Sequence, residues 1–420
     1  MDTVSSGSGS GPASGPGFRA VLNPLAGTAP SSGGAAGTGD AAATGDAATV
    51  LAFHRRLPGY EPTPLLSLPG LASRLGVREL LVKVEGSRFG LPAFKLLGAS
   101  WATYRAVSGR LAEQTGSSAS QGLGEWADIE ELAHLLKPLL PFRLAAATDG
   151  NHGRAVARMA RWLGFDARVF VPGGTTDTRV AAIESEGAEV AVVDGSYDEA
   201  VERASGEAGP RCLVVNDTSG PGYVDVPRWV AEGYGTMFVE VDDALARAGH
   251  GAPDVVVVPI GVGALAAATV SRFANGGDCG DGQHPVHVIG VEPTGAACVT
   301  ASALAGRIVT VARPRSIMAG LNCDTPSSVA WPLVSRGVSA FVTIDDDWAR
   351  EAVRALAACG VQAGETGGAA LGGLMALQRE GRETPVAGLV GEGTSVLVLV
   401  TEGPTDLVAW RQILGAELVA

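Results

Sequence analysis

Short apolar runs alternate with longer, more polar segments along most of the chain, and this pattern predicts strands that alternate with helices. The valine run at residues 255–258 is typical of a strand buried on both faces of a sheet. Strands are predicted at 79–85, 142–147, 167–171, 189–193, 211–215, 254–258, 286–291 and 395–400. Helices are predicted at 128–136, 154–163, 178–186, 197–205, 264–273 and 347–359. This alternation indicates an α/β fold whose sheets are mostly parallel and flanked by helices.

The first 48 residues lack this pattern. They consist mainly of Gly, Ser, Ala, Thr and Pro with few large apolar side chains. Such a segment buries too little surface to offset the entropy of ordering it, so residues 1–48 are predicted to be a disordered tail. Residues 108–124 contain a second Gly/Ser patch and are predicted to form a surface insertion, and residues 364–368 are predicted to form a Gly-rich turn.

Composition limits the possible partners and locations. The 420 residues provide enough chain for two or three domains, and the net charge of -13 argues against a nucleic acid or an anionic membrane as partner. No apolar run is long enough to span a bilayer, and the N-terminus lacks the features of a signal peptide, so a cytoplasmic protein is predicted. The five cysteines and six histidines show neither a disulfide framework nor the spacing of a metal site.

Lys95 is the first candidate for chemistry. It follows a loop that contains Gly and Pro and precedes an apolar run to Val107, which predicts a lysine at the start of a helix. The helix dipole and apolar neighbours are expected to lower its pKa, and a neutral amine can form a Schiff base with an aldehyde cofactor. On this stretch alone, an ordinary solvated lysine is the better explanation. Lys83 competes with it, but its place in a strand favours solvent exposure or pairing with an acid.

Two strands run into glycine-containing turns followed by helices. The strand at 142–147 leads into Thr-Asp-Gly-Asn-His-Gly at 148–153, and the valine strand leads into Gly261-Val262-Gly263-Ala264. In such turns the backbone can approach an anion closely, at the N-terminus of the following helix. The first turn is a weak signal by itself, because many α/β turns contain Gly and Asn.

The second turn has an alternative interpretation as a dinucleotide-binding fingerprint. Ala266 is acceptable at the sixth position of that motif. The motif also requires an acidic residue about 20 positions further on, near the end of a second strand. The nearest acids, Asp278 and Asp281, lie in a glycine-rich loop, and the segment is late in the chain. A single phosphate is therefore the favoured ligand of Gly261 to Ala264.

The last predicted strand ends at Thr401-Glu402-Gly403, where a threonine hydroxyl is placed to bond a pyridine nitrogen. A turn threonine that bonds a backbone group is an equally good explanation for this position alone.

Six short motifs, in their order and spacing, carry a resemblance to a known family. They are 88–95 (Arg-Phe-Gly-Leu-Pro-Ala-Phe-Lys), 148–154 (Thr-Asp-Gly-Asn-His-Gly-Arg), 216–218 (Asn-Asp-Thr), 261–264 (Gly-Val-Gly-Ala), 318–321 (Met-Ala-Gly-Leu) and 401–403 (Thr-Glu-Gly). From about Leu51 to the C-terminus, the chain resembles the fold type II pyridoxal-phosphate enzymes, the tryptophan synthase β type. Within them it is most similar to the diaminopropionate ammonia-lyases.

The resemblance implies a fold, a cofactor and a reaction. The expected protein is a homodimer of two-domain α/β chains, with a large domain at 49–102 and 223–420 and a small domain at 103–222. Its cofactor would be pyridoxal 5'-phosphate and its substrate a small amino acid. The implied reaction is β-elimination from 2,3-diaminopropionate to give pyruvate and ammonia. Two alternatives stay open: a serine/threonine dehydratase-like β-eliminase, and a non-catalytic protein that binds pyridoxal phosphate or a nucleotide.

The resemblance also assigns roles to individual residues. Lys95 would bind the cofactor covalently, Asn151 would contact the 3-oxygen of its ring, and Thr401 would meet its pyridine nitrogen. The amides of Gly261, Val262, Gly263 and Ala264 would hold its phosphate. Asp149 and Asp217 would be the two acid/base residues, one for each face of the substrate α-carbon. Asp149 is assigned to the D-isomer and Asp217 to the L-isomer.

The chain departs from the family pattern at several positions. Val84 stands where an Asp is usual, Ala99 where a Gly is usual, and Trp101 near a usual Tyr. After Asp217-Thr218, residues 219–223 read Ser-Gly-Pro-Gly-Tyr where the family tends to have Trp and Glu, so this loop bears on substrate preference. Cys298 and Cys323 fall where some members have a disulfide. In a reducing cytoplasm the default is two free thiols.

Overall fold

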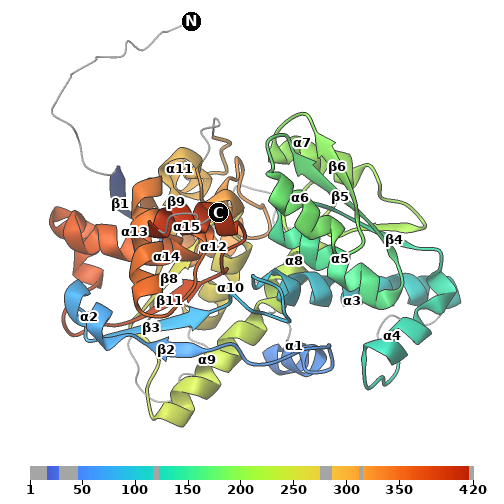
Figure 1. Ribbon diagram of the computed structural model, residues 1–420, viewed down its shortest axis with the longest axis horizontal. Coiled ribbons are helices and arrows are strands. Elements are labelled where there is room, and N and C mark those ends of the chain that lie inside the picture. The colour runs from blue at the N-terminus through green and yellow to red at the C-terminus, as the bar shows by residue number, and fades with distance from the viewer. Residues whose placement is uncertain (1–16, 28–45, 117–122, 275–285, 312–315, 416–420) are drawn as a thin grey trace, which may run out of the picture.

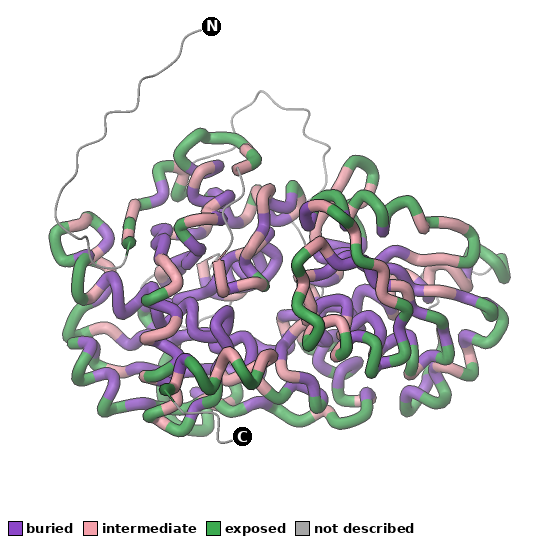
Figure 2. The backbone as a smooth tube through the Cα atoms, turned by 45° about the horizontal axis from the view of Figure 1, so that its top comes forward, coloured by how far each residue is buried: buried purple, intermediate pink, exposed green. Residues whose placement is uncertain are grey.

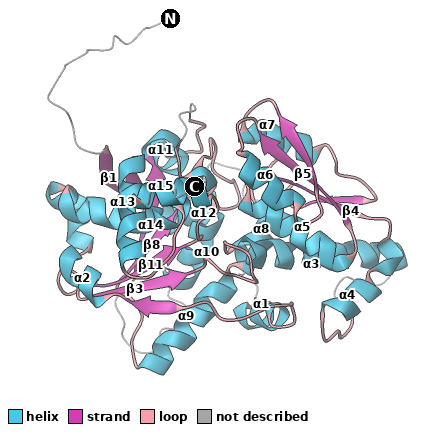
Figure 3. Cartoon of the chain, in the orientation of Figure 1, coloured by secondary structure: helices cyan, strands magenta, loops and turns pink. Residues whose placement is uncertain are grey.

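The computed structural model describes residues 17–27, 46–116, 123–274, 286–311 and 316–415. They form two α/β bodies side by side, each built on its own sheet, with helices on both faces (Figures 1 and 3). Buried segments run through the inside of both bodies and exposed segments lie at their periphery (Figure 2). No helix within these ranges combines the length and the apolar composition needed to cross a bilayer.

The larger sheet has seven strands. Their order is β1 (Phe18–Leu22), β10 (Ala340–Ile344), β9 (His287–Pro293), β8 (Val255–Pro259), β11 (Ser395–Val400), β3 (Glu79–Val84) and β2 (Leu65–Ser67). The five central strands are parallel, and β1 and β2 pair antiparallel at the two ends of the sheet. Residues of β8 face the two sides alternately: Val256 and Val258 belong to the same apolar cluster as α10 (Ala264–Phe273), whereas Val255 and Val257 pack with α14 (Glu365–Arg379).

The smaller sheet has four parallel strands in the order β6 (Glu189–Val193), β5 (Asp166–Pro172), β4 (Arg143–Ala147) and β7 (Cys212–Val214). One face packs on α5 (Asn151–Leu163), which also contacts α3 (Lys95–Thr115), and the other packs on α7 (Tyr197–Ser205). The remaining helices are α1 (Ala47–His54), α2 (Pro69–Leu75), α4 (Ile129–Leu135), α6 (Asp177–Glu184), α8 (Asp225–Gly233), α9 (Gly235–Ala248), α11 (Cys298–Ala305), α12 (Trp331–Gly337), α13 (Asp346–Ala358) and α15 (Leu407–Leu414).

The structure confirms the α/β fold with mostly parallel sheets, and every predicted strand is present to within two residues at each end. Two other predictions were wrong in part. Residues 18–22 of the predicted disordered tail form β1, because the run Phe-Arg-Ala-Val-Leu pairs with β10, more than 300 residues away. Residues 1–16 and 28–45 lie outside the described residues. The predicted surface insertion starts later than expected because α3 continues to Thr115; residues 117–122 are likewise outside the described ranges.

The predicted Gly-rich turn at 364–368 is also wrong, because α14 begins at Glu365. Its glycines serve close packing rather than a turn. A Cβ on Gly367 would lie 2.2 Å from the carbonyl oxygen of Glu402, so only glycine lets this helix contact the end of β11. A glycine cluster in a sequence does not distinguish a turn from such a close contact.

Candidate active site

One cleft lies where the carboxyl ends of β4, β7, β8 and β11 meet the start of α3. It opens to solvent, and the space between its walls and mouth, open solvent included, is about 1070 Å³. All nine predicted site residues line this cleft: Lys95, Asp149, Asn151, Asp217, Gly261, Val262, Gly263, Ala264 and Thr401. Parallel sheets bind ligands at the carboxyl ends of their strands, which is where these residues lie.

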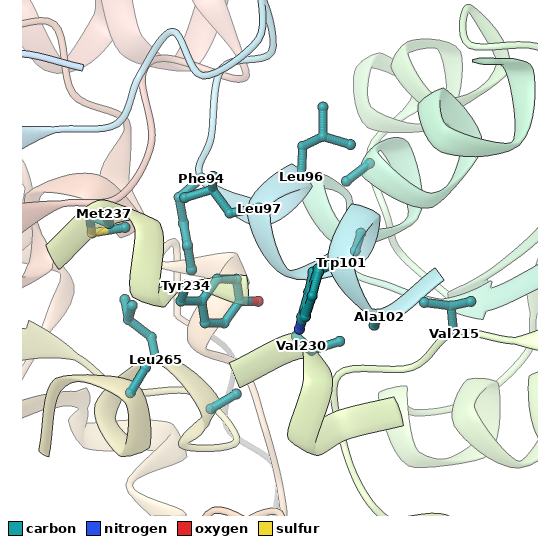
Figure 4. Packing of buried hydrophobic residues seen from close by; sticks show 14 of the residues in the cluster. Phe94, Leu96, Leu97, Trp101, Ala102, Val215, Val230, Tyr234, Met237 and Leu265 are labelled. Carbon is teal, nitrogen blue, oxygen red and sulfur yellow. The ribbon is translucent and has the colours of Figure 1, made fainter. Parts of the chain in front are cut away.

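Lys95 is the first residue of α3, and the loop before it is fastened to the end of β11. The N–H of Phe94 donates to the Thr401 carbonyl at 3.3 Å, and the N–H of Gly403 donates to the Pro92 carbonyl at 2.8 Å. The Phe94 ring packs against Tyr234, with ring centres 4.7 Å apart (Figure 4). The backbone of Lys95 therefore has little freedom, and its side chain extends from a fixed base.

The Lys95 amine is paired with Asp217. Its Nζ donates to Asp217 Oδ2 at 2.7 Å, and the Tyr197 hydroxyl donates to Oδ1 of the same carboxylate at 2.9 Å. Burial lowers the pKa of Lys95, but the attraction of Asp217 outweighs it, so the pKa lies above its usual range. For Asp217, burial raises the pKa and Lys95 outweighs this, so the pKa lies below its usual range. The prediction of a lowered lysine pKa was wrong, because the partner comes from a strand end 122 residues away.

Asp149 has a contrasting environment two residues beyond the end of β4. It is half-buried, and its carboxylate accepts no hydrogen bond from the rest of the described chain. Burial raises the pKa of Asp149 to about 7; Arg179 opposes the shift and Asp217 adds to it. The cleft thus holds one carboxylate that is kept ionised and another that titrates near neutrality. Such a difference is typical of groups with distinct acid/base roles.

The turn after β8 fits a phosphate. Gly263 has a φ of +103°, and α10 starts at the next residue. None of the N–H groups of residues 261–266 donates to an acceptor in the described ranges, so they are available to an anion. A Cβ on Gly261 would lie 3.1 Å from the Gly320 carbonyl oxygen, so a larger residue at 261 would have to displace the segment that carries Gly320.

Thr401 and Asn151 complete the fit to a ring cofactor. Thr401 Oγ1 is buried and has no hydrogen-bond partner among the described residues, unlike a turn threonine that satisfies a backbone group. A buried hydroxyl without a partner is costly, and a ring nitrogen would satisfy it. Asn151 Nδ2 donates to Glu402 Oε2. The residues present therefore fit pyridoxal phosphate, although its contact with Asn151 stays a prediction.

Lys83 lies elsewhere, in a buried group of charges. Its Nζ donates to Glu240 Oε2 at 2.7 Å, and Arg88 bonds both Glu85 and Glu240. All four side chains are at most 3% exposed. Of the two environments expected for Lys83, solvent exposure or pairing with an acid, the structure shows the pairing. Lys83 does not line the cleft, so it is no longer a competitor of Lys95.

Sequence reasoning missed several polar residues that line the cleft, among them Tyr197, Arg179 and Glu402. Glu402 lies within the Thr-Glu-Gly motif, and that motif could have identified it as a site residue. Tyr197 and Arg179 lie in helices α7 and α6, where nothing in the local sequence distinguishes them from packing or surface residues. Within the described ranges the cysteines Cys212, Cys298, Cys323 and Cys359 are free thiols.

Known proteins give an independent comparison. The family described as "Pyridoxal-phosphate dependent enzyme" matches residues 56–402. Diaminopropionate ammonia-lyase of Escherichia coli (strain K12) is 34% identical over 373 residues, covering 86% of this chain and 89% of that protein. A crystal structure of the Escherichia coli lyase in complex with D-serine superposes with a TM-score of 0.81 at 30% identity, covering 96% of this chain and 99% of that one. An L-serine dehydratase/L-threonine deaminase of Rattus norvegicus is less similar, at 28% over 295 residues, with 67% of this chain and 73% of that protein covered.

Proposed function

The chain belongs to the family of pyridoxal-phosphate-dependent enzymes, within it to the diaminopropionate ammonia-lyases, and from this we propose that it eliminates ammonia from 2,3-diaminopropionate. The products are pyruvate and ammonia. The observation that carries the proposal is the meeting of Lys95, Asp149, Asp217 and the free amides of residues 261–266 in one cleft. The lower similarity of the serine dehydratase makes the dehydratase reaction the second candidate.

The residues in the cleft would hold the cofactor at three points. Lys95 binds it covalently, the amides of Gly261 to Ala264 hold the phosphate, and the unsatisfied Thr401 hydroxyl meets the ring nitrogen. When bound, the cofactor supplies an electron sink for negative charge that develops at the substrate α-carbon. The bulk protein is acidic, so these local amides rather than its net charge hold the phosphate.

The two aspartates divide the proton transfers. Asp217 Oδ2 is in hydrogen-bond contact with Lys95 Nζ, so this carboxylate accepts the amine proton that Lys95 must lose before it reacts. Asp149 follows β4 and Asp217 follows β7, so they reach the substrate from different strand ends. We assign removal of the α-proton of the D-isomer to Asp149 and of the L-isomer to Asp217. A base within hydrogen-bond reach of the α-carbon proton is the requirement for each.

Kinetics of two variants on both enantiomers test this function. Asp149→Asn is expected to lose pyruvate release from D-2,3-diaminopropionate and to keep most of it from the L-isomer, with Asp217→Asn showing the reverse. Equal losses on both isomers in both variants would contradict the assignment of one base to each face. A wild-type protein that ignores diaminopropionate but releases pyruvate from serine would establish the dehydratase activity instead. Bound pyridoxal phosphate without any turnover would favour a non-catalytic binding protein.

The proposal also covers the domain boundaries, the oligomeric state and the cellular location. The small domain would comprise residues 103–222, which contain the whole four-stranded sheet, with 49–102 and 223–420 forming the large domain. The protein would act as a homodimer, which light scattering tests as twice the chain mass of 42.4 kDa. A cytoplasmic location agrees with the free thiols of Cys298 and Cys323, and fractionation of the source cells tests it.

A further inference from the structure

Three serines fasten the loop that follows Asp217 to the segment at residues 327–329. Ser219 Oγ lies 2.9 Å from Ser327 Oγ and 2.9 Å from Ser328 Oγ, and it accepts the N–H of Val329 at 3.2 Å. A hydroxyl donates one hydrogen bond and accepts two, so these contacts use the full capacity of Ser219. We call Ser219, Ser327 and Ser328 the serine clasp.

The clasp joins the Asp217 loop to the candidate phosphate site. Ser327 is 2% exposed, and its N–H donates to the Val262 carbonyl at 2.9 Å. A Cβ on Gly263 would lie 3.3 Å from Ala330 Cβ, so the segment that carries the clasp also packs against this turn. A displacement of the clasp would therefore shift both the Asp217 loop and the turn at Gly261 to Ala264.

The other end of the loop is held separately. The Tyr223 hydroxyl donates to the Val214 carbonyl at 2.9 Å and accepts the N–H of Asn216 at 2.9 Å, which fixes it to the end of β7. Asp217 lies between this anchor and the clasp. The turn that carries Asp149 is fastened separately, by Asn151 Nδ2, which donates to Glu402 Oε2 at the end of β11, so its hold on the larger sheet does not depend on the clasp.

We propose that the serine clasp is a positioning device that fixes Asp217 and thereby determines the preference between substrate enantiomers. This inference rests on the proposed function, because it takes Asp217 as the base for the L-isomer. Loss of the clasp frees Asp217 on one face of the substrate and leaves Asp149 on the other face in place.

The test compares Ser219→Ala and Ser328→Ala with Ser205→Ala, a control that removes an exposed hydroxyl of α7 bonded only within its helix. In Ser219→Ala, kcat/KM for L-2,3-diaminopropionate is expected to fall about fivefold, the size of one ordinary hydrogen bond, and kcat/KM for the D-isomer to change by less than about twofold. Ser328→Ala should show a smaller change in the same direction. Ser219→Thr, which keeps the hydroxyl, should recover most of the L-isomer activity.

Two further measurements separate the clasp from the proposed function. Exchange of the α-proton of L- and D-alanine in deuterated water requires no leaving group, so it reports on the two bases even if elimination fails. Amide hydrogen exchange of residues 218–223 in the cofactor-free protein should be faster in Ser219→Ala and unchanged in Ser205→Ala. Equal effects on both enantiomers, or unchanged amide exchange, would overturn the proposal. Absence of wild-type activity on both diaminopropionate isomers would instead reject the proposed substrate.

Discussion

Lys95 Nζ and Asp217 Oδ2 lie 2.7 Å apart, although the two residues are 122 positions apart in the chain. The pair keeps the amine charged and the carboxylate ionised. An attacking amine must be neutral, so the carboxylate that raises the lysine pKa is also the nearest acceptor of its proton. In the proposed function, the free ammonium of Lys95 and the amine that reacts with the cofactor thus differ by a proton that moves within one hydrogen bond.

The covalent attachment point is the first prediction. Lys95→Ala is expected to lose the visible absorption of the lysine-linked cofactor and all turnover, whereas Lys137→Ala, which removes an exposed lysine, should retain both. Borohydride reduction of the wild type followed by peptide mapping should place the label on Lys95. A label on Lys83 would refute the assignment and would require the buried charges around it to open.

The phosphate turn gives the second prediction. Val in place of Gly263 must adopt a φ of +103°, which a β-branched residue rarely does, and its Cβ would press on Ala330. Gly263→Val is expected to bind pyridoxal phosphate at least about tenfold more weakly, or about 1.4 kcal/mol. Gly109→Ala is the control, because a Cβ there meets no atom within 4 Å. Equal cofactor affinity in wild type and Gly263→Val would move the phosphate to another part of the cleft.

The unequal carboxylates predict different pH profiles for the two enantiomers. A general base works when deprotonated, and the pKa of Asp149 is raised to about 7 by burial. Activity on the D-isomer should therefore fall below pH 7 by about tenfold per pH unit. The pKa of Asp217 lies below its usual range beside the Lys95 amine, and the Tyr197 hydroxyl still donates to its carboxylate when Lys95 is bound to the cofactor, so activity on the L-isomer should persist to lower pH. Superimposable profiles of kcat/KM for the two isomers would show that one group limits both reactions.

The buried charges around Lys83 predict a large effect on stability. Glu240→Ala leaves Lys83 and Arg88 without one of their two carboxylate partners in a site at most 3% exposed. Removing one member of such a group typically costs about 3–5 kcal/mol of the free energy of unfolding. Arg110→Ala breaks an exposed pair with Glu113 and should change the free energy of unfolding by less than about 1 kcal/mol. Urea unfolding of both variants decides the matter, and a small loss in Glu240→Ala would mean that water enters the site.

The parts of the site that the sequence predicted are those encoded locally. Gly261, Gly263, Asp149 and Thr401 each follow directly on a recognisable strand, and parallel strands bring such positions to one place. The features that sequence reasoning missed depend on contacts distant in the chain. The sign of the Lys95 pKa shift depends on Asp217, and the role of Gly367 depends on the Glu402 carbonyl. Local patterns carry no information about such partners, so these errors concern charge and close packing rather than fold.

The antiparallel strand β1 has a consequence for the integrity of the protein. It covers β10, whose five residues, Ala340 to Ile344, are all buried and almost wholly apolar. A chain that began at residue 23 would lack β1. The backbone N–H and C=O groups along that side of β10 would then have no partners. Exposed apolar strand edges of this kind pair with other molecules and promote aggregation. Five residues near the N-terminus, remote from the cleft in sequence, thereby protect the larger sheet from edge-to-edge association.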